Sequence, residues 1–141
     1  MKHAVLLVDD EDTIRTMLRM VLELTGFKVL EAADGIQAIE QVETHQPDIM
    51  VLDVMMPRMD GFAVCRQLRS QTETADLPII MFSGKAQEEA VREGMKAGAT
   101  HYLVKPASPT EIIALIKKYL ERINMPVDSS TEQDAVGLGG D

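Results

Sequence analysis

The sequence has few aromatic residues and only one cysteine. Aromatic residues make up 4% of the 141 residues, and tryptophan is absent. The hydrophobic residues, 45% of the total, are therefore mostly aliphatic, and they suffice for the core of one domain. Cys65 has no partner for an internal disulfide, which is typical of a reducing cytoplasm. We expect Cys65 to be a small buried side chain on a helix, with a reactive thiol as the less favoured alternative.

Basic residues and long hydrophobic runs are also scarce. The chain has 14 Lys and Arg against 23 Asp and Glu, which gives a formal net charge of −9. This acidic character argues against nonspecific binding to nucleic acids or to anionic membranes. No hydrophobic run is long enough to span a bilayer, and the run near the N-terminus is too short for a signal peptide. We therefore expect a cytoplasmic protein that binds neither membranes nor nucleic acid directly.

Short hydrophobic runs, each suited to one buried strand, recur along the chain. They lie at residues 4–8, 27–30, 49–52, 79–82 and 102–104. Each run is followed by hydrophobic residues at helical spacing. The capping residues around them predict five helices: one ended by Gly26, two that begin after Asp34 and Asp60, a weaker one over residues 86–97, and one over about 110–123 that begins after Ser108.

Five strand–helix units in succession predict an α/β fold, a doubly wound parallel sheet with helices on both faces. We assign residues 1–123 to this domain. Residues 124–141 lose the hydrophobic periodicity and contain four acidic residues and no basic residue. We expect them to form a flexible acidic tail or linker.

Functional groups in open α/β sheets lie at the carboxyl ends of the strands. Here Asp9 and Asp10 follow the first run, Asp53 follows the third, Ser83 follows the fourth and Lys105 follows the fifth. The second run is followed by Glu31 and two alanines, which add few candidate functional groups to this edge of the sheet. If the first and third strands are neighbours, the three carboxylates converge and repel one another unless a cation lies among them.

Mg²⁺ is the favoured cation, because it accepts few protein oxygens and retains waters or substrate oxygens. A cation, a lysine, a hydroxyl and a carboxylate nucleophile together make a phosphoryl-transfer site. Each group alone has a structural interpretation: the aspartates as helix caps, Ser83-Gly84 as a turn and Lys105 as a solvated surface residue. Their combination, each at a strand end in this order, favours the functional interpretation.

Four segments carry a resemblance to a known family. They are Val8-Asp9-Asp10-Glu11, then Asp53-Val54-Met55-Met56-Pro57-Arg58-Met59-Asp60-Gly61, then Ser83-Gly84, then Lys105-Pro106. With these segments, residues 2 to about 123 resemble the receiver domains of bacterial two-component response regulators, which are CheY-like. The resemblance implies a flavodoxin-like fold with strand order 2-1-3-4-5.

The resemblance further implies that Asp53 is the phosphoacceptor and receives its phosphoryl group from a sensor histidine kinase or a phosphotransfer protein. Mg²⁺, for which Mn²⁺ can substitute, is then bound by Asp10, Asp53 and the backbone carbonyl of Met55, with Asp9 acting through water. Such a protein is not an enzyme in the usual sense, because it catalyses only its own phosphorylation and dephosphorylation.

The same resemblance assigns the switch. Ser83 is the switch hydroxyl, Lys105 contacts the phosphoryl group, Tyr102 is the aromatic switch residue and the peptide bond before Pro106 is cis. We expect Tyr102 to turn into space that Ser83 vacates. The helix over 86–97, the last strand and the helix over 110–123 then form the surface for an unknown downstream protein. No output domain is recognised after these residues, so we expect a single-domain regulator unless the chain is part of a longer protein.

Two residues are expected to set the lifetime of the phosphorylated state. Met55 and Lys85 lie two residues beyond Asp53 and Ser83, positions that flank the approach of the hydrolytic water in the family. Met55 cannot orient a water, and the cationic Lys85 cannot accept its proton. We therefore expect a long-lived phosphorylated state, unless both side chains point to solvent.

Three other interpretations remain open from the sequence. A haloacid-dehalogenase-type phosphatase also uses an aspartate after a first strand, but Ile14 stands where that motif needs a small polar residue. A flavodoxin-type flavin module needs a hydroxyl- and glycine-rich phosphate loop, and the corresponding loop here is acidic. A degenerate receiver used only for protein binding would not need the complete site.

Overall fold

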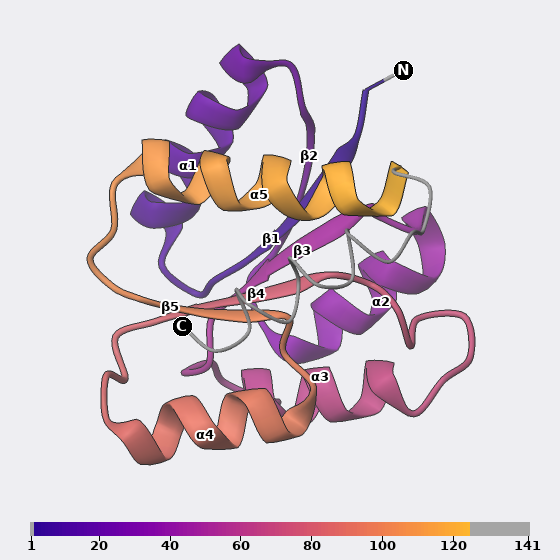
Figure 1. Cartoon of the computed structure of the whole chain (residues 1–141), viewed down its shortest axis with the longest axis vertical. Helices are drawn as coiled ribbons and strands as arrows, with labels where there is room; N and C mark the ends of the chain where they lie inside the picture. Colours follow the sequence, from indigo (N-terminus) through magenta and orange to yellow (C-terminus); the bar gives the residue numbers. More distant parts are fainter. Residues whose placement is uncertain (1, 125–141) are drawn as a thin grey trace.

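The computed structural model describes residues 2–124, in which five strands and five helices alternate (Figure 1). The strands are β1 (Ala4–Val8), β2 (Lys28–Ala32), β3 (Ile49–Leu52), β4 (Ile79–Ser83) and β5 (His101–Val104). The helices are α1 (Asp12–Thr25), α2 (Gly35–His45), α3 (Gly61–Arg69), α4 (Glu88–Ala97) and α5 (Pro109–Asn124). The expected alternation of strands and helices is therefore confirmed.

The strands form one parallel sheet in the order β2-β1-β3-β4-β5, as expected. β1 and β3 are neighbours, with Val8 opposite Leu52 at their carboxyl ends. The second strand begins at Lys28, one residue later than its hydrophobic run suggests. The reason is that the N–H of Phe27 donates to the Leu22 carbonyl and closes the end of α1, around a left-handed Gly26.

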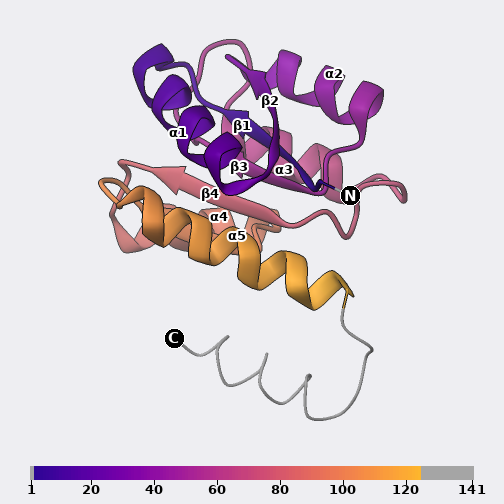
Figure 2. The same cartoon turned by 90° about the horizontal axis from the view of Figure 1, so that it is seen from above.

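Helices cover both faces of the sheet, so the structure has three layers (Figure 1). Figure 2 views the same molecule from the side of α1 and α5. α1 and α5 pack on one face, where their side chains join those of the strands in one core cluster. α2, α3 and α4 pack on the other face in a second cluster, which includes Cys65. Cys65 is fully buried, in agreement with the expectation for this residue.

Side chains cap three of the helices as the sequence predicts. Asp34 accepts from the Gln37 N–H at the start of α2, and Asp60 accepts from the Ala63 N–H at the start of α3. The Ser108 hydroxyl accepts from the Glu111 N–H at the start of α5. α4 begins at Glu88, two residues later than expected, and its N-cap residue Gln87 has an extended backbone and makes no side-chain capping bond.

The expected acidic tail over residues 124–141 lies outside the described residues except for Asn124. Among residues 2–124, no helix combines the length and the hydrophobicity that crossing a membrane would require.

Candidate phosphoryl-transfer site

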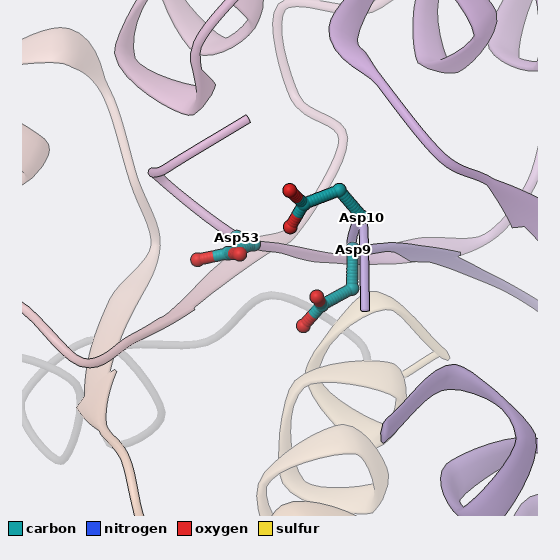
Figure 3. Close-up of side chains that lie close together, drawn as sticks. All are labelled: Asp9, Asp10 and Asp53. Carbon is teal, nitrogen blue, oxygen red and sulfur yellow. The ribbon is translucent and has the colours of Figure 1, made fainter. Parts of the chain in front are cut away.

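Three aspartate side chains meet at the carboxyl ends of two neighbouring strands. Asp9 and Asp10 directly follow β1, and Asp53 directly follows β3. The N–H of Asp53 donates to the Val8 carbonyl at 2.9 Å, which extends the pairing of the two strands into the site. One oxygen from each carboxylate lies within 4.8 Å of the others, and Figure 3 shows the three side chains close together.

The three carboxylates differ in their exposure. Asp9 and Asp53 are buried, with exposed fractions of 5% and 4%, whereas Asp10 is exposed. The site therefore has two carboxylates in its wall and one at its rim.

Lys105 is the cation that contacts this cluster most closely among the described residues. Its Nζ lies 2.9 Å from Asp9 Oδ2, 3.7 Å from Asp53 Oδ2 and 3.6 Å from Glu11 Oε1. Burial acts to lower the pKa of Lys105, but the hydrogen bond to Asp9 and the charges of Asp53 and Asp9 raise it above its usual value. Lys105 is therefore a fixed positive charge at neutral pH.

The pKa of Asp53 is raised to about 6, first because burial disfavours the carboxylate and second because Asp9 repels it. Lys105 and the backbone N–H groups of Met55 and Val54 oppose this shift. Lys105 alone thus does not compensate the charge of the neighbouring carboxylates. A further cation in the cluster would favour the ionised form of Asp53, which is the nucleophilic form.

The donors fit a hard divalent cation such as Mg²⁺. They are carboxylate oxygens, and the exposed Asp10 leaves room for the water ligands that Mg²⁺ retains. The Met55 backbone lies beside them, since its N–H is 3.4 Å from Asp53 Oδ1. The residues that the sequence suggests for Mg²⁺, namely Asp9, Asp10, Asp53 and Met55, are thus next to one another.

Ser83 and Lys105 are also neighbours. Ser83 ends β4 and is fully buried, and its carbonyl accepts from the Lys105 N–H at 2.8 Å. Its hydroxyl oxygen accepts from the Lys85 N–H at 3.2 Å. The peptide bond between Lys105 and Pro106 is cis.

Tyr102, the residue expected to act as the aromatic switch, lies beside α4 and the loop that precedes it. Its ring already packs beside Met81 and Gly94, and its hydroxyl donates to the Lys85 carbonyl at 2.7 Å. Gly94 makes this packing possible, because a Cβ at that position would lie 2.8 Å from the Tyr102 ring. Whether the ring turns when Ser83 moves on phosphorylation stays a prediction.

Met55 and Lys85 lie at the surface. Met55 is 57% exposed and Lys85 is exposed in the loop between β4 and α4. Their backbones adjoin the site through the contacts of Met55 with Asp53 and of Lys85 with Ser83.

Two features of the site were missed in the sequence. The sequence pattern predicts Glu31 just after the second strand and gives it no role. In the structure Glu31 lies inside β2 and forms ion pairs with Arg15 and Arg19 of α1. Arg15 also donates to the Asp9 carbonyl at 2.6 Å, so this network supports the loop that holds Asp9. The signal was the i, i+4 spacing of the two arginines, which places them on one helix face.

The chain matches a family model over most of its length. Residues 5–117 match the model described as "Response regulator receiver domain". Among curated proteins, the alkaline phosphatase synthesis transcriptional regulatory protein PhoP of Bacillus subtilis is 42% identical over 130 residues, which cover 92% of this chain and 53% of PhoP. The chain spans about half the length of the first curated relatives it matches.

Solved structures give the same picture. The chemotaxis response regulator CheY4 of Vibrio cholerae has a TM-score of 0.79 and 34% identity, covering 84% of this chain and 98% of CheY4. The receiver domain of the sensor histidine kinase PA1611 of Pseudomonas aeruginosa PAO1 has a TM-score of 0.80 and 28% identity, covering 86% and 99%. That structure has a magnesium ion coordinated in its active site cleft.

Proposed function

Because the chain belongs to the response regulator receiver domains of two-component systems, we propose that it is a Mg²⁺-dependent switch that is phosphorylated on Asp53. The observation that carries this proposal is the meeting of Asp9, Asp10 and Asp53 beside Lys105. The donor is a phosphohistidine of a sensor histidine kinase or of a phosphotransfer protein.

In the proposed reaction, an oxygen of Asp53 attacks the phosphorus. The bond from phosphorus to the donor nitrogen breaks, the electron pair stays with the imidazole, and an acyl phosphate forms on Asp53. Lys105, held by Asp9, balances the charge of the phosphoryl oxygens, and the Ser83 hydroxyl can donate to one of them. The chain catalyses only this transfer and the later hydrolysis of its own acyl phosphate.

A cation held here would supply the positive charge that offsets the repulsion between the Asp53 carboxylate and the phosphoryl oxygens. Asp10, Asp53 and the Met55 carbonyl would hold it, with Asp9 acting through water. The relative PA1611, which has magnesium in its cleft, supports this choice of ion. We expect Mn²⁺ to substitute, because its oxygen coordination is similar.

Intact-mass analysis after incubation with acetyl phosphate and Mg²⁺ tests the assignment. The wild-type chain should gain one phosphoryl group, and a chelator added beforehand should prevent the gain. Asp53→Asn should gain none. The control is Asp76→Asn, which changes an exposed aspartate outside the cluster and should be labelled like wild type. Equal labelling of Asp53→Asn and wild type would contradict the assignment. Repeated turnover of a phosphate ester would instead favour the phosphatase interpretation.

The output surface is proposed to comprise α4, β5 and α5. Tyr102 supports this proposal, because it lies on β5 beside α4 and binds the β4–α4 loop through the Lys85 carbonyl. A change at Ser83 can therefore reach α4 through that loop. NMR shifts on adding beryllium fluoride should concentrate in these elements, and shifts confined to the aspartate cluster would count against the proposal.

The downstream target is expected to be a protein. That this chain does not itself bind nucleic acid stays a prediction, since PhoP is by name a transcriptional regulatory protein and this chain corresponds to about half of it. A gel-shift titration with duplex DNA, with and without phosphorylation, tests it.

A further inference from the structure

The loop between β3 and α3, residues 53–60, is fastened at its tip to the start of α2. Arg58 Nε donates to Asp34 Oδ2 at 2.9 Å, and Arg58 Nη2 lies 2.7 Å from the same oxygen. The other oxygen of Asp34 accepts from the Gln37 N–H and caps α2. The Gln37 N–H, and to a lesser extent Arg58, lower the pKa of Asp34, so the ion pair is charged at neutral pH.

Arg58 has an unfavourable backbone conformation for a residue with a side chain. Its φ of +67° lies in the left-handed region, which glycine adopts freely and other residues adopt at a cost. Such a conformation persists only where the surrounding contacts hold it. Two contacts hold it here. One is the ion pair with Asp34, and the other is the close packing of Met59 against Gly35, where a Cβ on residue 35 would collide with the Met59 carbonyl.

The other end of the loop is fixed against β3. The Gly61 N–H donates to the Val54 carbonyl at 2.9 Å, and Gly61 packs against the Asp53 backbone with no room for a Cβ. Val54 is buried. Met55 therefore lies between the anchored Val54 and the tip of the loop, whose conformation depends on Arg58. The Met55 side chain is largely exposed, so it contributes little to holding the loop in place.

We propose that the Arg58–Asp34 ion pair is a positioning pair that sets the affinity of the aspartate cluster for Mg²⁺ without touching the ion. It holds the strained loop so that the Met55 backbone stays beside Asp53, where its carbonyl can act as the proposed ligand. This inference rests on the proposed function, because Met55 is assigned there as a ligand.

Two substitutions at one position separate this role from a simple charge effect. Arg58→Ala removes the ion pair, but alanine has a Cβ and the left-handed conformation is still unfavourable for it. Without the ion pair to hold it, the loop should move to a less strained conformation. Arg58→Gly removes the same ion pair and the same charge, but glycine adopts the left-handed conformation without strain. Loss of a positive charge near an acidic site would by itself strengthen Mg²⁺ binding. A weakening in Arg58→Ala is therefore opposite in sign to the electrostatic expectation.

The first measurement is a calorimetric titration of each protein with Mg²⁺. We expect Arg58→Ala to bind on the order of tenfold more weakly than wild type, and Arg58→Gly to recover most of that loss. Asp34→Asn, which keeps a good helix cap, should resemble Arg58→Ala. Arg66→Ala, which removes an exposed arginine from α3, is the control for net charge.

The second measurement is amide hydrogen exchange without metal. The Met59 and Gly61 N–H groups, which donate to the Pro57 and Val54 carbonyls, should exchange faster in Arg58→Ala than in Arg58→Gly or wild type. Equal exchange and equal Mg²⁺ affinity in the two Arg58 variants would overturn the proposal. A wild-type chain that does not bind Mg²⁺ would contradict the proposed function, and the exchange rates would still decide whether the ion pair holds the loop.

Discussion

At the scale of single residues, the lifetime of an acyl phosphate depends on whether a water can be positioned in line with the bond that breaks. Met55 and Lys85, both at the surface beside the site, offer no group that accepts a proton from such a water. We therefore predict that Met55→Asn and Lys85→Glu each shorten the phosphorylated lifetime, by roughly three- to tenfold. The measurement is the decay of the phosphorylated mass after the donor is removed.

Lys96→Glu provides the charge control for Lys85→Glu, because Lys96 is an exposed lysine near the end of α4. It should decay at the wild-type rate. If neither Met55→Asn nor Lys85→Glu decays faster than wild type, the two side chains do not set the lifetime.

We predict that the partly buried His101 makes the free energy of unfolding depend on pH, independently of the aspartate cluster. Burial, reinforced by Lys118, lowers the pKa of His101, and Glu111 opposes the shift. Its Nδ1 lies 3.2 Å from the Tyr119 hydroxyl of α5. Because the folded state disfavours the charged imidazole, its contribution to stability is present above the ordinary pKa of 6.5 and is lost as the pH falls through 6.5 toward the lower folded value.

The free energy of unfolding should therefore fall between pH 7.5 and pH 5 by more in wild type than in His101→Gln. Urea titrations at a series of pH values measure this difference. His45→Gln, which removes an exposed histidine at the end of α2, is the control for a His-to-Gln change elsewhere. Parallel curves for wild type and His101→Gln would show that His101 is not the group responsible.

At the scale of elements, Gly94 shows why α4 tolerates a poor helix former. Glycine costs a helix about 1 kcal/mol relative to alanine. Yet a Cβ at position 94 would lie 2.8 Å from the Tyr102 ring and 2.9 Å from Met81 Sδ. We predict that Gly94→Ala displaces the ring, breaks the Tyr102–Lys85 hydrogen bond and lowers stability by roughly 1 kcal/mol, because overpacking outweighs the gain in propensity.

A double-mutant cycle with Tyr102→Ala tests this explanation. Once the ring is removed, Gly94→Ala should be neutral or stabilising, so the two changes should be strongly non-additive. Additive effects in urea denaturation would mean that Gly94 and Tyr102 do not share this space.

The arrangement of the elements could be predicted because it follows from local patterns. Hydrophobic runs, caps such as Asp34 and Asp60, and the left-handed turn at Gly26 each act over a few residues. The carboxylate cluster could be predicted for a related reason, since the end of a strand fixes where Asp9 and Asp53 lie.

Contacts between distant segments could not be predicted in this way. The Arg58–Asp34 pair joins residues 24 apart, and no periodicity indicates which acid an arginine in a loop will meet. The packing of the Tyr102 ring could not be predicted for the same reason, because it depends on the absence of a Cβ at Gly94 on a different element. The roles proposed for the site residues, unlike their positions, stay predictions until the chemistry is measured.

At the scale of the whole molecule, the aspartate cluster links folding to metal concentration. Repulsion among Asp9, Asp10 and Asp53 opposes folding, and a cation that binds only the folded chain relieves it. At free Mg²⁺ about 100 times the dissociation constant, the gain is about 2.7 kcal/mol, or on the order of 10 °C in Tm. Scanning calorimetry across a Mg²⁺ series should show this rise, and a chelator should reverse it.

Asp10→Asn should abolish most of the Mg²⁺-dependent rise, since it removes the exposed carboxylate that is expected to bind the ion directly. Asp76→Asn should keep the rise. The same Mg²⁺ response in Asp10→Asn and wild type would place the ion elsewhere on the chain.

The burial of Cys65 makes the chain a clean background for site-specific labelling. The thiol is fully buried and burial raises its pKa, so it reacts slowly with maleimides. A cysteine introduced on the surface, such as Glu89→Cys on α4, would then take up a fluorophore almost alone. Because the sequence has no tryptophan, an indole placed in the β4–α4 loop would likewise be the sole one. Either probe allows movement of α4 to be followed optically, on a stopped-flow timescale, as the phosphoryl group arrives.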